Sequence, residues 1–568
     1  MKGLWALIAL SVALTPANLK LIEEQRLEKG LRNLEPQAIV LVQRGIDEFK
    51  RGNLRDAQFD LDAARRLSPD MPYVYFSLAG INLSLSREGL FKAVNYFTDG
   101  CMAMLRNFWW SFHMAATVYM AIFIALILSF IVFIVYLFVT RLPLLMHDIS
   151  EDRKNIFYIL PMPLFILLGP AILLLYIIFV LWPYCNKREK IISSLIVISF
   201  AFCPLSIPTL GTFMDAQLSP YLKAVVDVNE GKDNRYAISR LKGDRRWDAS
   251  FSYALALKRE GYYDEAIRIY QGLLKDKADA RVYNNMGNCY TALKNYDMAM
   301  DYYKKAMDIR KLVSTYYNIS QVLRERLDFE GADASYREAI KMDPDRVSGY
   351  RHREGTSPNR FVMDETLSMA ELWGIAFSVP SGAYSGAVWR GMSVLPIGLS
   401  PFVALIFGIA IYLRGRFLST GVYICRRCGN ILCDRCEKRI TKGISSGEGM
   451  CLRCYRTLVK IDELEPKARI ERILDINTFQ NKRRTRVGLL SLILPGMGHL
   501  YAGKTIRGFL LIFAFVFLLG IFALWGAFFP SIPAISLSEL RIAILLVAVL
   551  LYGYINLMVF RGTLKGWL

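Results

Sequence analysis

Three Cys-x-x-Cys pairs lie within thirty residues of the sequence, and they are the side chains best suited to chemistry. Their six thiols are Cys425, Cys428, Cys433, Cys436, Cys451 and Cys454. Each pair places two thiolates where one metal ion can bind both, and zinc prefers four such ligands in a tetrahedron. Thiolates bind metal only in the reduced form, so the spacing predicts a Zn2+ site in a reducing compartment. A disulfide staple is the alternative, which this spacing disfavours.

The residues from Cys425 to Cys436, together with Cys451-Leu-Arg-Cys454-Tyr455, resemble the latter two-thirds of a FYVE-type zinc finger. That family holds two zinc ions with eight ligands, and alternating pairs share each ion. The first pair of the family is missing here, because residues 415–424 contain no Cys or His, and the basic run that binds phosphoinositides is missing too. The resemblance therefore implies a zinc-braced finger over residues 421–460, without lipid recognition.

By the same resemblance, the first and third Cys pairs share one zinc ion. The spacer between Cys428 and Cys433 is also short for a loop that must return to the same ion. The middle pair, Cys433 and Cys436, then either stays reduced or shares an interchain zinc ion with the same pair of a second chain, which leaves a homodimer open. We expect one zinc ion per monomer.

The composition indicates a membrane protein. Of the 568 residues, 54% are hydrophobic and only 21% are charged, and the formal net charge is +20. Eighteen Lys and Arg against eight Asp and Glu lie between Arg414 and Arg486. Such a segment could bind nucleic acid or anionic lipid, but the positive flank of membrane helices is the simpler explanation. A membrane-lipid partner is therefore favoured over nucleic acid.

Apolar runs alternate with soluble segments along the chain. Apolar stretches at Ala115–Val139, Ile191–Phe213, Met392–Leu413, Ile506–Phe529 and Ile542–Phe560 are long enough to span a bilayer. Residues 156–182 are apolar but interrupted by prolines, which suits a segment that enters and leaves on one side. Residues 141–155 are polar and predict a loop. The remaining short segments are a signal peptide or N-terminal anchor at 1–17 and an amphipathic basic linker at 461–486.

The C-terminal part contains the run Pro495-Gly-Met-Gly498-His-Leu-Tyr501-Ala-Gly503-Lys504. It resembles a two-helix bacterial membrane module with the pattern Pro-Gly-x-Gly-x-x-Tyr-x-Gly-Lys. The resemblance covers residues 487–568 and implies no activity. Small residues at these positions allow close helix packing or a re-entrant bend.

Five columns of residues recur with a period of thirty-three, which predicts stacked helical hairpins. The columns are Ala266, Ala299 and Ala332; Tyr270, Tyr303 and Tyr336; Leu273, Ala306 and Ala339; Tyr263, Tyr296 and Phe329; and Ala254, Gly287 and Ser320. This pattern resembles tetratricopeptide repeats over residues 214–370, and a degenerate form is seen over 18–112. One hairpin cannot bury its own face, so stacking creates both a core and a concave groove.

The groove is the predicted binding surface for a protein or peptide. Asn288, Asn318 and Arg351 fall where carboxylate-clamp members of the repeat family place Asn, Asn and Arg. The two Lys positions of that clamp hold Asn284 and Val347, so the clamp is incomplete. The same register places further side chains in the groove, namely Lys258, Tyr317, Gln321 and Arg324.

The predicted fold is mainly α: a multi-span membrane protein with tetratricopeptide-type α-solenoid domains and a small zinc-braced finger. Its domains are the 18–112 helices, membrane helices at 113–213, the 214–370 repeats, a membrane helix at 384–413, the 421–460 finger and the 487–568 module. Basic residues flank the spans so that the repeats face the periplasm and the finger faces the cytosol of a bacterial inner (cytoplasmic) membrane. No catalytic constellation is present, so we expect a scaffold for protein–protein interaction and not an enzyme. The alternative is a component of a membrane transport or secretion channel.

Overall fold

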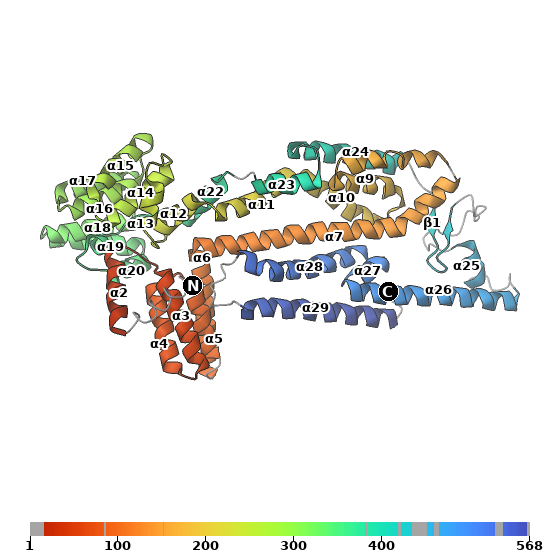
Figure 1. Cartoon of the computed structure of the whole chain (residues 1–568), viewed down its shortest axis with the longest axis horizontal. Coiled ribbons are helices and arrows are strands. Elements are labelled where there is room, and N and C mark those ends of the chain that lie inside the picture. Colours follow the sequence, from red (N-terminus) through yellow and green to blue (C-terminus); the bar gives the residue numbers. More distant parts are fainter. Residues whose placement is uncertain are drawn as a thin grey trace, which may run out of the picture. The chain divides into compact units, whose positions relative to one another are not determined.

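The computed structural model describes residues 16–83, 87–151, 153–380, 383–417, 422–433, 451–458, 465–528 and 538–564 (Figure 1). This part of the chain is mainly helical, with one two-stranded sheet. The chain divides into two compact units. Of the described residues, those within 16–114 and 212–380 form the repeat unit, and those within 115–211, 383–528 and 538–564 form the apolar unit.

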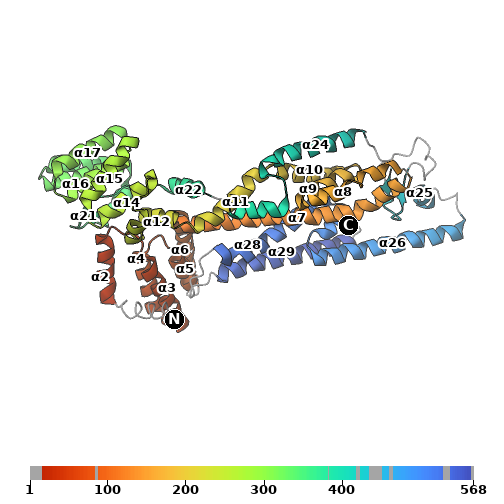
Figure 2. The same cartoon turned by 45° about the horizontal axis from the view of Figure 1, so that its top comes forward.

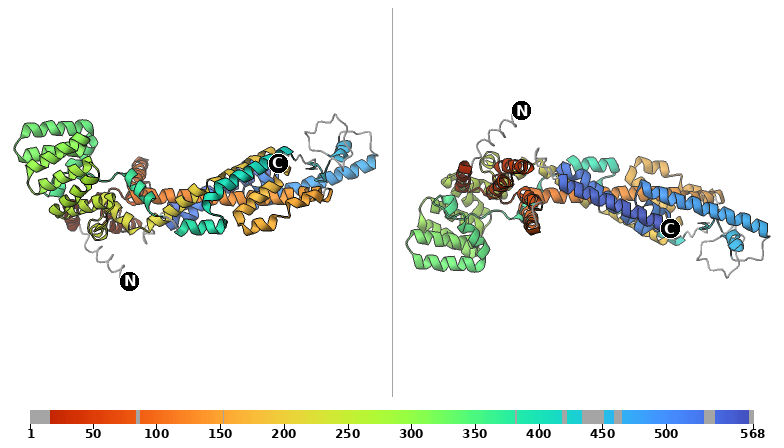
Figure 3. Two further views of the ribbon diagram at one scale, coloured as in Figure 1. Left: turned by 90° about the horizontal axis from the view of Figure 1, so that it is seen from above. Right: turned by 90° about the horizontal axis from the view of Figure 1, so that it is seen from below.

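The repeat unit contains a stack of helical hairpins (Figure 3). Its helices are α12 (Pro220–Asn229), α13 (Arg235–Leu241), α14 (Trp247–Arg259), α15 (Tyr263–Asp276), α16 (Ala280–Ala292), α17 (Tyr296–Ile309), α18 (Val313–Glu325), α19 (Phe329–Met342) and α20 (Pro344–Arg351). The turn inside each hairpin has a residue with positive φ, and these residues, Gly261, Lys294 and Leu327, are also thirty-three apart. The period therefore fixes the turns as well as the helices.

The repeating columns form the core of the stack. Ala266, Ala299 and Ala332 are buried, as are Tyr270 and Tyr303. Small residues are needed where helices approach: a Cβ on Gly287 would lie 2.4 Å from the ring of Tyr303. Of the two aromatic columns, Tyr270 and Tyr303 are core residues, whereas Phe329 is exposed.

After α20 the chain continues into a short helix, α21 (Pro358–Phe361), then an extended stretch, then α22 (Met369–Ser378). Figure 2 shows α21 beside the inner helices of the stack, and α21 contacts α16. We call the extended residues 362–368 the strap. Val362, Met363, Glu365 and Leu367 of the strap are buried.

The N-terminal helices pack with the repeats as part of one unit. They are α2 (Pro16–Glu28), α3 (Glu35–Lys50), α4 (Leu54–Leu67), α5 (Pro72–Leu83) and α6 (Arg87–Arg106), of which α3–α4 and α5–α6 form hairpins. The backbone N–H groups of Arg32 and Asn33 donate to Gly231 O at 2.8 and 3.0 Å. Lys232 Nζ lies 2.9 Å from Glu35. The predicted signal segment, 1–17, lies almost wholly outside the described residues.

The apolar unit is built on α7 (Phe108–Glu151), whose first residues belong to the repeat unit. Its other helices are α8 (Met162–Leu167), α9 (Pro170–Leu181), α10 (Lys187–Ala201), α11 (Cys203–Gln217), α23 (Ala383–Met392), α24 (Ser400–Phe417), α26 (Pro466–Ile493), α27 (Met497–Tyr501), α28 (Thr505–Phe528) and α29 (Ser538–Leu564). Helix α24 packs on α9 and α10, and α28 packs on α27 and α29.

Four of the described helices are long and apolar enough to cross a membrane. They cover Phe108–Ser150, Ile397–Phe417, Thr505–Trp525 and Arg541–Thr563. Helices α10 and α11 pass the same test together but are bent by 62°, so they make a fifth candidate if they form one span. Helices α8 and α9 are apolar and short.

Three segments differ from the sequence-based expectation. The predicted polar loop at 141–155 is largely helical, because α7 continues to Glu151 and Arg141 is neutralised by Glu189 at 2.5 Å. The predicted span at 191–213 is bent at Phe202, between α10 and α11. The predicted helix at 384–413 is interrupted after Met392, and the apolar helix runs from Ser400 to Phe417.

The predicted basic linker at 461–486 is also not separate from the C-terminal module, because α26 continues through it to Ile493. Glycines of the C-terminal run then bring α26, α27 and α28 close together. A Cβ on Gly498 would lie 2.5 Å from Val487 O, and one on Gly496, whose φ is 101°, would lie 2.5 Å from Gly508 O. The Pro-Gly-x-Gly part of the run is therefore needed for backbone-to-backbone packing.

Candidate functional site

The concave side of the repeat stack is filled by the strap. Met363 is held through its backbone: its carbonyl oxygen accepts from the side-chain amides of Asn284, Asn288 and Asn318 at 3.2, 3.0 and 3.0 Å. Its N–H donates to Asn318 Oδ1 at 2.7 Å. These asparagines are completely buried and come from two neighbouring repeats, on α16 and α18.

The same kind of contact continues along the strap. Asn285 accepts from Glu365 N and donates to Glu365 O, both at 2.9 Å. Leu367 N donates to Asn229 Oδ1 at 2.8 Å. Because an amide side chain offers both a donor and an acceptor, these asparagines bind the main chain of an extended segment whatever its side chains are.

Two carboxylates of the strap fix its register. Asp364 lies 3.0 Å from Lys258 Nζ and 3.5 Å from Arg259 Nε, and it accepts from Asn288 Nδ2 at 2.8 Å. Burial alone would raise the pKa of Asp364, but the charges of Lys258 and Arg259 outweigh it and hold that pKa below its usual value. Glu365 accepts from Ser314 Oγ at 2.6 Å and from Arg346 at 2.8 Å.

A layer of hydroxyl groups beneath the asparagines orients them. Tyr303 donates to Asn288 Oδ1 at 2.8 Å, and Thr315 Oγ1 donates to Asn284 Oδ1 at 2.9 Å. Asn318 Nδ2 also lies 2.9 Å from Asn288 Oδ1. The amides are thus held in the orientation that binds the strap, which reduces the entropy lost when a peptide is bound.

The eight groove residues predicted from the sequence are placed in three ways. Lys258, Asn284, Asn288 and Asn318 contact the strap. Tyr317 and Gln321 are buried on α18; Tyr317 donates to Glu354 at 2.8 Å, and no described residue is bonded to the amide nitrogen of Gln321. The Arg324 guanidinium lies 5.5 Å from the ring centre of Tyr336, and Arg351 is exposed.

Sequence reasoning missed several side chains that hold the strap, and it missed the strap itself. These missed side chains are Asn229, Arg259, Asn285 and Ser314, and Arg346, which donates to Glu365, is a fifth. A signal was present for one of them, because Asn285 and Asn318 are thirty-three residues apart, in step with the other columns. Nothing in the sequence pattern of 362–368 distinguishes it from an ordinary linker.

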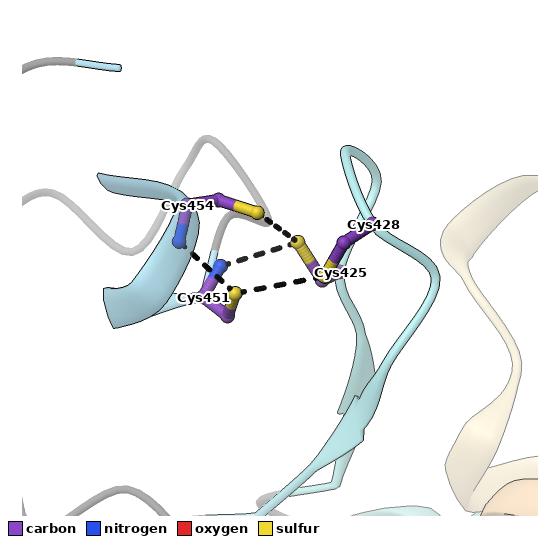
Figure 4. Close-up of side chains that lie close together, drawn as sticks. All are labelled: Cys425, Cys428, Cys451 and Cys454. Carbon is purple, nitrogen blue, oxygen red and sulfur yellow. Dashed lines mark hydrogen bonds between the residues drawn. The ribbon is translucent and has the colours of Figure 1, made fainter. Parts of the chain in front are cut away.

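The second candidate site is a group of four cysteines in the apolar unit (Figure 4). The Sγ atoms of Cys425, Cys428, Cys451 and Cys454 lie within 4.8 Å of one another. The Cys425–Cys454 and Cys428–Cys451 sulfur atoms are both 3.8 Å apart, which is too far for a disulfide bond. Tetrahedral sites with Zn–S bonds of about 2.3 Å place the sulfur atoms about 3.8 Å apart, so this arrangement could hold such an ion.

Two short elements position the cysteines. Strands β1 (Tyr423–Ile424) and β2 (Ile431–Leu432) are antiparallel, and the turn between them contains the first pair; Gly429 in this turn has a φ of 79°. Helix α25 (Leu452–Leu458) carries Cys454 and follows directly after Cys451. The backbone N–H of Cys451 donates to Cys425 Sγ at 3.3 Å, as expected for a sulfur atom that carries negative charge.

Cys433, from the middle Cys pair, lies apart from the group of four. Cys433 is buried in the apolar core together with Val422 and does not belong to the group of four. Cys436 lies outside the described residues. The expected joining of the first and third pairs thus agrees with the geometry, while the role of each cysteine as a zinc ligand stays a prediction.

The four-cysteine group rests on α26. Ile476 packs against Cys425, Cys451 and Cys454. Gln480 Nε2 donates to the backbone oxygens of Arg426 and Arg427 at 2.9 and 2.7 Å. Phe479 lies directly over Gly429, where a Cβ would come within 2.2 Å of its ring.

Comparison with protein families identifies two tetratricopeptide repeats, at residues 280–311 and 313–346. These correspond to α16–α17 and to α18–α19 with the start of α20, so the predicted repeat type is confirmed for them. The FYVE-type and C-terminal resemblances stay predictions. A search of the curated proteins finds no match.

Proposed function

We propose that the protein is a membrane-anchored scaffold that binds a protein partner through its repeat groove. Tetratricopeptide repeats are typical of protein–protein interaction, and the observation that carries the proposal is the bound strap. This groove holds the strap as an extended peptide, through main-chain bonds to asparagines and through a carboxylate bonded to Lys258. An extended peptide of matching chemistry that replaced the strap would make the same contacts.

A photo-crosslinking amino acid in place of Arg351 tests this function in cells. Arg351 is exposed on α20, an inner helix of the stack, and Asp333, exposed on the outer helix α19, provides the matched control. We expect a defined protein adduct from the Arg351 position and much less from the Asp333 position. Equal adducts from both positions, or none from either, would contradict a groove-directed scaffold.

The four-cysteine group is proposed to hold a structural Zn2+ ion. Four thiol ligands with no open position suit a structural site better than a catalytic one. The packing of Ile476, Phe479 and Gln480 against the finger supports this role, because it ties the ion to the helix that leads into the C-terminal module.

The division of the chain into two compact units limits the possible membrane topologies. The repeat unit is one compact unit although its parts, residues 16–114 and 212–380, are separated by ninety-seven residues. Both parts must therefore lie on the same side of a membrane, which requires an even number of crossings between them. One crossing by α7 and one by the bent pair α10–α11 satisfy this rule. Helix α9, with 12 residues, reaches only about 18 Å, too short for a bilayer core of about 30 Å.

By the same count, the proposed position of the finger is on the side opposite the repeats. Helix α24 would supply the third crossing, so the described part of the finger and the start of α26 would lie on the other side, and α28 and α29 would return the chain to that side. The basic flanks of these helices favour the cytosol for the finger and the periplasm for the repeats. The proposed location is thus the inner membrane of a bacterium, with zinc in the reducing compartment.

Labelling with a membrane-impermeant thiol reagent tests this topology. We expect Ala334→Cys, exposed on α19, to react in intact cells, and Thr485→Cys, exposed on α26, to react only after the membrane is opened. Both changes are made in a Cys101→Ser background, since Cys101 is half-buried in the repeat unit. Reaction of Thr485→Cys in intact cells, with Ala334→Cys protected, would reverse the orientation.

A further inference from the structure

The groove of the repeat unit has no free place for an outside peptide while the strap is bound. Asn284, Asn285, Asn288 and Asn318 all direct their amides to strap main-chain atoms. Lys258, which is completely buried, has Asp364 as its only ion-pair partner in the described chain. A partner that used these groups would have to replace the strap.

The strap is tied at both ends. Before it, Asn359 donates to Arg259 O and to Glu28 O, both at 2.8 Å. At its other end, the last strap residue, Ser368, forms a capping box with Glu371 of α22, and Glu371 also pairs with Arg281 at 2.7 Å. A segment tied in this way binds its site with an effective concentration on the order of millimolar, so it outcompetes weak ligands.

One end of the strap borders open space. Leu367, Trp247 and Asp248 line a cleft of about 300 Å³, together with Ile375 and its neighbours on α22. An incoming chain can contact this end first and replace the strap contacts one after another. This cleft therefore offers a starting point for exchange.

Resting on the proposed function, we propose that the strap is a resident occupant that an outside partner displaces. The partner presents an extended acidic peptide of the form apolar–Asp–Glu–any residue–apolar, as in Met363-Asp364-Glu365-Thr366-Leu367. The Asp is required because Lys258 would otherwise be buried without a counter-charge. Proline is excluded at the Met363 and Glu365 positions, since the N–H groups of both donate to asparagines.

The test uses the full-length protein in mild detergent and a fluorescent peptide with the sequence of residues 361–369. The variant Glu365→Pro weakens the strap and leaves every groove side chain in place. We expect it to bind the peptide at least about a hundredfold more tightly than the wild type does. The variant Thr366→Ala, a position at which the strap needs no particular side chain, should behave as the wild type. A peptide with Lys at the Asp364 position should not bind to either protein.

A second measurement does not depend on the variant. In the wild type, the amides of Met363, Glu365 and Leu367 should exchange slowly with deuterium, and excess peptide should speed their exchange. A folded Glu365→Pro protein that binds no better than the wild type, with strap exchange unchanged by peptide, would overturn the displacement model. If the Arg351 crosslink persisted in that case, the scaffold function would stand while the displacement model failed.

Discussion

Replacing Asp364 with alanine is expected to lower the free energy of unfolding of the repeat unit by about 3–5 kcal/mol. The change removes the counter-charge of Lys258, whose side chain is completely buried 3.0 Å away. It also leaves the amide of Asn288 with one acceptor fewer. Hydrogen exchange of the α14, α16 and α18 amides in the full-length protein measures this free energy.

Two variants make the prediction specific. Combining Asp364→Ala with Lys258→Met should recover much of the lost stability, because the completely buried charge of Lys258 is then removed together with its partner. Thr366→Ala should change the free energy by only about 0.5 kcal/mol. If the single and double variants were equally unstable, the ion pair would not be the cause.

The carboxylate of Asp364 also predicts that the stability of the repeat unit depends on pH in the acid range. The pKa of Asp364 is lowered in the folded state, so its contribution to stability is complete above its unfolded pKa and is lost as the pH falls. The stability of the Asp364→Asn variant should therefore fall less steeply on acidification than that of the wild type.

The largest effect on stability is expected from loss of the zinc ion, which should unfold the finger. The purified full-length protein should contain one zinc ion per chain, and Cys428→Ser should remove it, because three thiolates hold zinc far less tightly than four. Apparent binding free energies of structural zinc are about 10–16 kcal/mol, so its loss should unfold the finger. Elemental analysis gives the zinc content, and hydrogen exchange of α25 gives the folding state.

Cys436→Ser is the matched control, because Cys436 belongs to the pair that is not predicted to bind the ion. This variant should keep its zinc and its folded α25. Two tightly held zinc ions per monomer, or equal loss in both variants, would mean that the three Cys pairs are used differently.

Local periodicity made the repeats predictable, and spacing made the cysteine group predictable. The thirty-three-residue columns fix helices, turns and core together, and two residues of a Cys-x-x-Cys pair are close in any folded state. Asn288 and Asn318 were predicted from the resemblance to carboxylate-clamp members of the repeat family. The strap that these asparagines bind was not predicted. The hydrogen bond between Met363 and Asn318 joins residues forty-five apart in sequence, and it uses main-chain atoms of Met363, which carry no sequence signal.

The helix boundaries of the apolar unit were less predictable for a related reason. Hydropathy marks Arg141 as the end of an apolar run, but its charge is balanced by Glu189, which is forty-eight residues away in sequence. The same holds for Cys433, whose pattern indicates a ligand while its side chain is buried in an apolar core. Both depend on partners that only the folded chain brings together.

Because α26 is one continuous helix, it fixes the angle around its axis between the finger and the C-terminal glycines. Phe479 and Gln480 hold the finger at one angle around the helix, and Val487 meets Gly498 at another. One residue inserted between them would turn the finger by about 100° and shift it by about 1.5 Å. Four would nearly restore the angle but would add about 6 Å of height. The number of residues between Gln480 and Val487 therefore determines the direction in which the finger points.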